Sequence, residues 1–93
     1  MAIRTDAISE EEWAILRRSL GLSLLQTAIV KRLFRGRSRQ EIAREMAIRP
    51  RMVRTQTDRL YRELGVSNRV QLVLYLLASL RESWEQEGES LYV

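Results

Sequence analysis

Apolar residues recur along this chain at intervals of three and four, the spacing that places side chains on one face of an α-helix. No segment alternates apolar and polar residues between turn signals, as a strand would. The pattern divides into five segments, which we expect to be helices at 10–19, 24–35, 39–46, 50–64 and 68–85. Links of only a few residues place successive helices side by side. The sequence therefore predicts an all-α fold, a bundle of about five helices.

Capping residues mark the starts of these helices. Ser9, Ser23 and Ser38 are each followed three residues later by Glu or Gln. This is the capping box, in which the two side chains bond the free backbone N–H groups. Pro50 suits a first helical position because it has no N–H to leave unpaired. We expect Ser67 to cap the last helix in the same way as the other serines.

The predicted core consists of apolar residues at helical spacing or at the joints between helices: Ile29, Leu33, Ile42, Met46, Ile48, Val53, Leu60, Leu64 and Val66. Apolar residues make up 45% of the chain, which suffices for one modest core and argues against disorder. Because 93 residues are too few for two cores, we expect one domain and no separate sensor or receiver domain.

The residue types present exclude most enzyme and metal chemistry. The chain has neither Cys nor His, which removes disulfides, Cys/His zinc sites and the nucleophile–base pairs of hydrolases. Acidic residues lie mostly at helix starts and near the C-terminus, so we expect no catalytic residues, no metal and no cofactor. The longest apolar stretch, 70–80, is too short and interrupted for a bilayer, and no signal peptide is evident. We therefore expect a cytoplasmic protein without a membrane partner.

Positive charge is concentrated in the middle of the chain. The net charge is +4, but residues 37–69 hold nine Arg or Lys against four Asp or Glu, whereas residues 70–93 hold one against four. Such a block is typical of a polyanion binder, and a basic face that is merely solvated gives the same pattern. All but one of the basic residues are Arg, whose planar guanidinium suits phosphates and guanine edges.

This basic block contains two helices joined by a very short turn. Only Ala47, Ile48 and Arg49 separate the predicted helices 39–46 and 50–64. Such a pair describes a helix-turn-helix, whose second helix enters the major groove of DNA. Residues three, four and seven positions apart share one side of a helix. The side of the second helix that would face DNA holds Arg51, Arg54, Thr55 and Asp58, extended by Arg62.

Two segments of this region resemble the LuxR/GerE-type DNA-binding domain of bacterial response regulators and quorum sensors. They are GRSRQEIA at 36–43 and LGVSNR at 64–69. The resemblance covers most of the chain, from residue 22 to about residue 80. It implies a tetrahelical domain in which the third helix reads the major groove and the fourth forms the dimer.

The resemblance also implies roles for individual residues. Base or groove contacts are implied for Arg54, Thr55 and Asp58, and phosphate contacts for Ser38, Arg39, Arg51 and Gln56. Each phosphate contact should steepen the log–log dependence of affinity on salt by about 0.9. Loss of Arg39 or Arg51 is therefore expected to weaken binding to all DNA sequences alike.

The chain departs from the family's pattern near these positions. Gln26 replaces an acid that could pair with Arg69. Arg49 replaces the Ser that usually caps the recognition helix, and Met52 replaces a Thr in its first turn. Asp58 stands where a basic or neutral residue is common, and an acid there either accepts from cytosine N4 or repels phosphate. It fits a narrower sequence preference or a domain that has lost DNA binding.

The last predicted helix is apolar on more than one face, whereas a surface helix needs a single apolar stripe. The N-terminal helix could cover the extra faces through Trp13, Leu16 and Leu20, or a second subunit could. Because helix-turn-helix domains of this kind read paired half-sites, we expect a homodimer. Its predicted interface holds Val70, Val73, Leu74 and Leu77.

We divide the chain into an extra N-terminal helix (1–21), a LuxR-type helix-turn-helix domain (22–81) and an acidic C-terminal tail (82–93). The tail carries Trp84 and the terminal Leu91-Tyr92-Val93, separated by glutamates. We expect it to be a frayed terminus, with a short docking segment as the alternative.

These features predict a sequence-specific transcription regulator that binds double-stranded DNA and lacks a sensor domain. Its activity would be set by abundance or by a partner, such as RNA polymerase or another regulator. Two alternatives stay open: a domain resembling sigma-factor region 4, and a protein-interaction module that kept the fold and lost DNA binding. An enzyme is the least supported reading.

Overall fold

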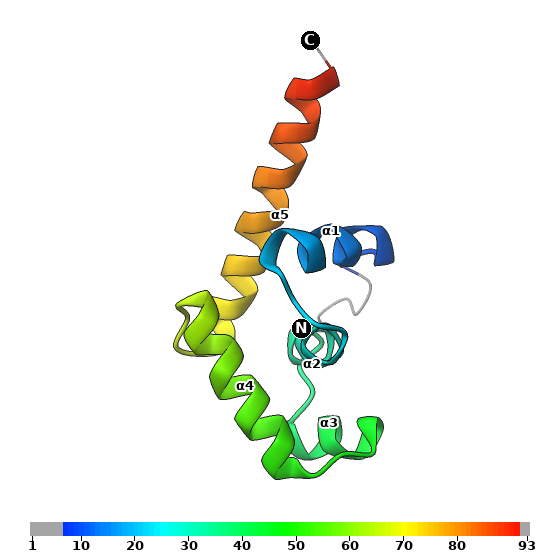
Figure 1. Ribbon diagram of the computed structural model, residues 1–93, viewed down its shortest axis with the longest axis vertical. Helices are drawn as coiled ribbons and strands as arrows, with labels where there is room; N and C mark the ends of the chain where they lie inside the picture. The colour runs from blue at the N-terminus through cyan, green and yellow to red at the C-terminus, as the bar shows by residue number, and fades with distance from the viewer. Residues whose placement is uncertain (1–6, 92–93) are drawn as a thin grey trace.

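Five α-helices make up the computed structural model, which describes residues 7–91, with side chains described for residues 7–85. They are α1 (Glu10–Leu20), α2 (Leu24–Phe34), α3 (Arg39–Met46), α4 (Pro50–Leu64) and α5 (Arg69–Leu91). No strand occurs between residues 7 and 91. In Figure 1, α3 and α4 form the end of the molecule opposite the C-terminal end of α5, and α1 lies across the middle of α5. The predicted all-α fold is confirmed.

The predicted capping boxes are present at the starts of α1, α2 and α3. The hydroxyl oxygens of Ser9, Ser23 and Ser38 accept from backbone N–H groups three residues later, at 3.1, 3.0 and 3.1 Å. The prediction for Ser67 is wrong. Helix α5 begins at Arg69, so Asn68 is the residue whose side-chain oxygen can reach the third helical N–H. Asn68 Oδ1 accepts from the N–H of Gln71 at 2.9 Å.

The predicted helix ends need small corrections for α1 and α2 and a larger one for α5. Helix α1 ends at Leu20 and α2 at Phe34, each one residue from the predicted end. Helix α5 continues to Leu91, beyond the predicted end at residue 85, so residues 86–91 of the predicted acidic tail are helical. Residues 81–91 contain no Pro, and a single Gly weakens a helix without ending it. The side chains of Glu87 and Glu89, and residues 92–93, lie outside the described part.

The core draws side chains from all five helices. Five of the nine predicted core residues are buried: Ile29, Leu33, Ile42, Val53 and Leu60. The other four, Met46, Ile48, Leu64 and Val66, are partly buried against them. The prediction left out α1 and α5, which add Trp13, Leu16, Leu72, Leu76 and Leu80. The core is therefore larger than the helix-turn-helix region alone.

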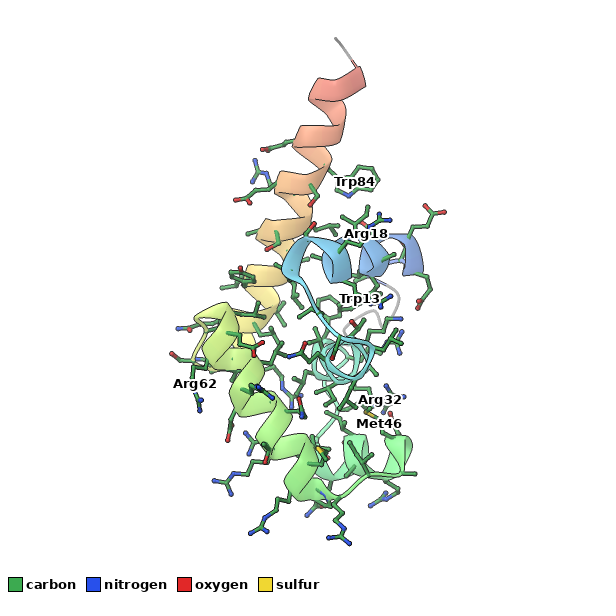
Figure 2. The ribbon with its side chains drawn as sticks, in the orientation of Figure 1. Trp13, Arg18, Arg32, Met46, Arg62 and Trp84 are labelled. Carbon is green, nitrogen blue, oxygen red and sulfur yellow. The ribbon has the colours of Figure 1, made fainter. Side chains whose placement is uncertain are left out.

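Helix α1 covers one face of α5, and another face of α5 stays exposed. Trp13 and Leu16 are buried, and Figure 2 shows the Trp13 ring pointing into the molecule from α1. The Trp84 indole N–H donates to Glu12 Oε2 at 3.3 Å, which ties the far part of α5 to α1. Val70, Leu74 and Leu77 remain on the surface, with 69%, 60% and 45% exposed. The intramolecular covering therefore accounts for part of the apolar surface of α5.

Substituting Thr57 by Val is expected to raise the free energy of unfolding by about 1 kcal/mol. Thr57 lies in α4 with 1% exposed, and its hydroxyl has no hydrogen-bond partner among the described residues. Valine has the same shape and removes a polar group that lost its bonds to water on folding. Urea denaturation followed by circular dichroism measures the change. A loss of stability instead would mean that the hydroxyl does find a partner, such as a trapped water.

Candidate nucleic-acid interface

A tight turn holds α3 against α4. Ala47 adopts a left-handed conformation (φ 54°, ψ 41°), and the N–H of Ile48 donates to the Ala43 carbonyl at 3.0 Å. This conformation is unfavourable for a residue with a Cβ, so the surrounding packing must maintain it. Ala43 is buried and Ile48 is partly buried against the core. The turn thereby fixes the direction in which α4 leaves α3.

Helix α4 divides into a buried side and an exposed side, as the sequence predicts. Val53, Thr57 and Leu60 are buried. The exposed side holds Arg51, Arg54, Thr55, Asp58 and Arg62. In Figure 2 the Arg62 side chain points outward from α4, away from the other helices. We call these five residues the outer strip of α4.

The arginines of the outer strip lack ion-pair partners among residues 7–85, whereas several other arginines nearby are paired. Arg32 and Arg37 both contact Glu45, at 3.1 and 3.2 Å. Arg59 lies 3.4 Å from Glu63. Arg51, Arg54 and Arg62 have no such partner in that range, so their guanidinium groups are available to an anionic ligand. Neither Arg51 nor Arg54 pairs with Asp58.

Asp58 pairs instead with Arg39, across the gap between α3 and α4. Arg39 Nη2 lies 3.9 Å from Asp58 Oδ1. The structure thus brings together a residue with an implied phosphate contact and one with an implied base contact. Sequence reasoning missed this pair, because the two residues are nineteen positions apart and on different helices. The sequence hinted at this ion pair only in that Arg39 and Asp58, which carry opposite charges, were both assigned to the surface that would face DNA.

The N-terminus of α3 presents Ser38 and Arg39 at the surface. The Ser38 hydroxyl oxygen accepts from the Glu41 N–H at 3.1 Å. The Ser38 backbone N–H donates to Glu41 Oε1 at 3.0 Å. This bond lowers the pKa of Glu41, with smaller contributions from the Ser38 hydroxyl and from Arg37 and Arg44. Glu41 therefore stays ionised and keeps the cap closed at neutral pH.

Gln26, Gln56 and Arg49 stand at positions where the sequence was compared with the luxR-type pattern, and the structure gives each a definite environment. Gln56 is partly buried, and its Nε2 lies 3.8 Å from Met52 Sδ as a donor. Gln26 closes the α2 capping box and donates to Glu63 at 3.2 Å, and no hydrogen bond joins it to Arg69 among the described residues. Arg49 is exposed at the N-cap of α4 and makes no side-chain capping bond. Sequence reasoning assigned Arg49 no contact, yet it adds a cation beside the outer strip.

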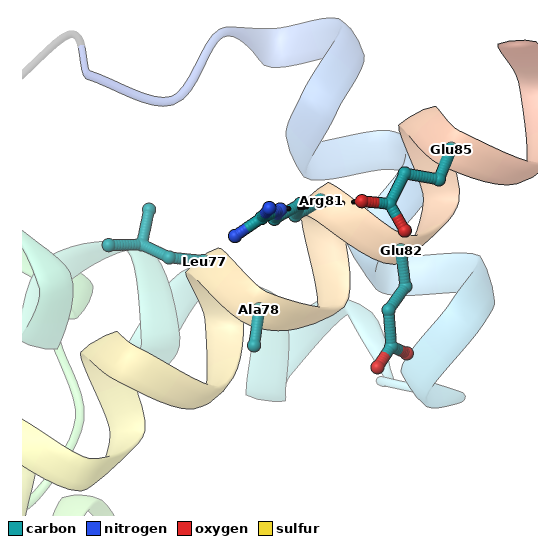
Figure 3. A pocket seen from close by; sticks show the side chains of 5 residues that line it. All are labelled: Leu77, Ala78, Arg81, Glu82 and Glu85. Atoms are coloured by element: carbon teal, nitrogen blue, oxygen red, sulfur yellow. Dashed lines mark ion pairs between the residues drawn. The ribbon is translucent and has the colours of Figure 1, made fainter.

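The predicted dimer residues divide between two environments on α5. Val70, Leu74 and Leu77 are exposed, whereas Val73 is partly buried against the core. An apolar groove beside them is lined by Leu33, Phe34, Gly36, Arg69, Val70, Val73 and Leu74. Figure 3 shows a second, shallow site further along α5, where Arg81 Nε lies 3.4 Å from Glu85 Oε1. All of its lining residues come from one helix, so it encloses nothing.

Within the described residues, no group of three or more acidic side chains could hold a metal ion. Among the helices described, none has the length and apolar content needed to cross a membrane.

A short helix turned tightly onto a second helix with unpaired outer arginines is the arrangement of helix-turn-helix DNA-binding domains. Comparison with family models matches residues 21–76 to GerE, the bacterial regulatory proteins of the luxR family. The chain therefore belongs to the luxR family of DNA-binding regulators, which is not a family of enzymes. This assignment favours a luxR-type domain over a domain resembling sigma-factor region 4. No curated protein and no solved structure matches the chain. Helix α1 and the part of α5 after residue 76 lie outside the matched segment.

Proposed function

We propose that this chain binds double-stranded DNA sequence-specifically through α4 and regulates transcription from the sites that it binds. The observation that carries the proposal is the outer strip of α4, where Arg51, Arg54 and Arg62 are exposed without ion-pair partners among residues 7–85. A guanidinium group that is not paired with an acid of the protein can bind a phosphate or the edge of a guanine. Membership in the luxR family supports the same ligand.

The proposed contacts follow from the position of each side chain. Arg54 and Thr55, in the first half of α4, would reach base edges, and Asp58 would lie at the edge of the same groove. Ser38 and Arg39 at the start of α3, with Arg51, would hold phosphates. Gln56 and Arg62 would contact the backbone at either side. Recognition helices read bases mainly with their N-terminal residues, which agrees with this division.

Selection from a random pool of double-stranded DNA tests the proposal. Purified protein is incubated with the pool at low and at moderate salt, and the retained DNA is sequenced. We expect enrichment of one sequence, arranged as a two-fold repeat. Retention without enrichment, lost as salt rises, would leave backbone binding only. No retention at either salt would refute DNA binding.

We also propose that the chain acts as a homodimer through α5. Val70 and Leu74 are more than half exposed and border the apolar groove between α2 and α5. A two-fold axis places the same patch of both subunits in contact, so a protruding side chain of one copy can fill the groove of the other. Isolated exposed apolar residues are ordinary, but a contiguous row beside a groove is typical of an interface.

The substitution Leu74→Glu is expected to raise the dissociation constant of the dimer at least about tenfold, because it places a charge in an apolar contact. Sedimentation velocity over a range of concentrations measures the change. Glu82→Ala changes an exposed charge on the same helix and serves as the control, with an unchanged constant. A wild-type protein that stays monomeric at tens of micromolar would contradict the dimer.

A second candidate function is a protein-interaction module, or a contact with RNA polymerase or another regulator. Leu24 is 71% exposed at the start of α2, and Met52 is exposed at the start of α4. These residues lie apart from the proposed dimer face. Because the proposed ligand is double-stranded DNA, we propose the cytoplasm as the place of action, with no cofactor required.

A further inference from the structure

The ion pair between Arg39 and Asp58 joins the two halves of the proposed DNA surface. Arg39 is the first residue of α3, and Asp58 lies in the third turn of α4. The side chains are 48% and 53% exposed, so both can also reach a ligand. Asp58 has Arg54 and Arg62 four residues away on its own helix, yet its ion-pair partner among residues 7–85 is Arg39.

This pair affects binding more than it affects folding. An ion pair at this exposure adds little to stability, because water screens both charges. It also opens readily when a ligand offers either partner a better contact. Asp58 is the one acid in the outer strip of α4, so its charge faces any polyanion that approaches the strip.

A phosphate and Asp58 compete for the same guanidinium group. If a phosphate draws Arg39 away, the Asp58 carboxylate is left without its partner beside DNA. A carboxylate only accepts hydrogen bonds, and guanine and thymine offer it acceptors alone in the major groove. Two bases offer a donor there, cytosine through its N4 amino group and adenine through its N6 amino group. The adenine amino group lies beside the N7 acceptor, which repels a carboxylate, so cytosine is the better partner. A cytosine beside Asp58 would therefore replace the contact that Arg39 gives up.

We propose that Asp58 is a specificity-determining residue that frees Arg39 for a phosphate only where a cytosine faces Asp58. The proposal rests on the proposed DNA binding. On other sequences Arg39 stays with Asp58, and one phosphate contact is lost. Arg39 then contributes to binding of the preferred site alone, in contrast to the sequence-based expectation that its loss weakens binding to all DNA.

Salt dependence on two duplexes tests the proposal. One duplex carries the site selected from the random pool, and the other a scrambled sequence of the same composition. Fluorescence anisotropy gives the dissociation constants between about 50 and 200 mM salt. The proteins compared are the wild type, Asp58→Asn, Arg39→Ala and the double variant. Arg51→Ala is the matched control, because Arg51 has no ion-pair partner among the described residues.

Asp58→Asn is expected to steepen the salt slope on the scrambled duplex by about 0.9, the value of one added phosphate contact. It should also reduce the preference for the selected duplex roughly tenfold, as expected when one base contact stops discriminating. Arg39→Ala should flatten the slope on the selected duplex and leave the scrambled one unchanged. In the double variant, the salt slope on the scrambled duplex should not show the steepening that Asp58→Asn alone produces. Arg51→Ala should flatten both slopes by about 0.9.

An unchanged slope of Asp58→Asn on scrambled DNA would overturn the proposal, as would equal weakening of both duplexes by Arg39→Ala. A selected site without cytosine at the position facing Asp58 would also overturn it. In these cases the wild type still binds DNA, so the proposed function stands. If the wild type binds neither duplex, both proposals fail together. Thermal melts of each variant show whether it is folded. Asp58→Ser, a second neutral replacement, should give the same change in salt slope as Asp58→Asn if the lost charge is the cause.

Discussion

Replacing Trp13 by Ala is expected to lower the free energy of unfolding by about 3–5 kcal/mol. Trp13 is 2% exposed, and its ring meets that of Phe34 edge-on, with ring centroids 5.7 Å apart. The truncation removes a large buried apolar surface and leaves a cavity that the neighbouring side chains fill only in part. Small domains have a total stability of about 5–15 kcal/mol, so the loss is a large share of the whole. Urea denaturation followed by circular dichroism measures it.

Leu24→Ala serves as the control, because Leu24 is largely exposed and its loss should change stability by no more than about 0.5 kcal/mol. The comparison also shows whether α1, which lies outside the segment that matches the luxR family, unfolds together with the rest of the domain. A large loss in Trp13→Ala, with a single unfolding transition, makes α1 part of one cooperative unit. A loss below about 1 kcal/mol would make α1 an appendage on an already stable domain.

The features that sequence predicts well in this chain are local. Ser9, Ser23 and Ser38 lie three residues before the Glu or Gln with which they cap, so each signal is complete within four residues. Pro50 fixes the start of α4 in the same local way. The division of α4 into a buried and an exposed side is also local, because it depends only on helical periodicity.

The features that sequence misses join segments that are far apart along the chain. For α5 the sequence offered two covers, Trp13 and Leu16 of α1 or a second subunit, and did not choose between them, because no local pattern specifies how α1 crosses α5. The partner of Asp58 depends on the angle that the turn at Ala47 sets between α3 and α4. The start of α5 differs by one residue from the prediction because Ser67 and Asn68 both suit a cap, and Asn68 is the one whose side-chain oxygen accepts from the N–H of Gln71.

Arg54→Ala is expected to reduce discrimination at one base position of each half-site by about 1–3 kcal/mol, or roughly five- to 150-fold. Arg54 is exposed in the second turn of α4, and it has no ion-pair partner among residues 7–85. A guanidinium group there can bond guanine O6 and N7 together, which alanine cannot do. Repeating the random-pool selection with the variant measures the effect. The preference at the position that Arg54 reads should disappear, while the other positions keep theirs.

Arg18→Ala is the matched control for the charge that Arg54→Ala removes. Arg18 is exposed on α1, far from the helix-turn-helix, as Figure 2 shows, and it lacks an ion-pair partner in the described range. Its loss should weaken binding to every sequence slightly and equally, since it changes only the long-range field of the protein. If Arg54→Ala also weakened all sequences equally, Arg54 would be a phosphate contact. The base-reading part of α4 would then have to lie with Thr55 and Asp58 instead.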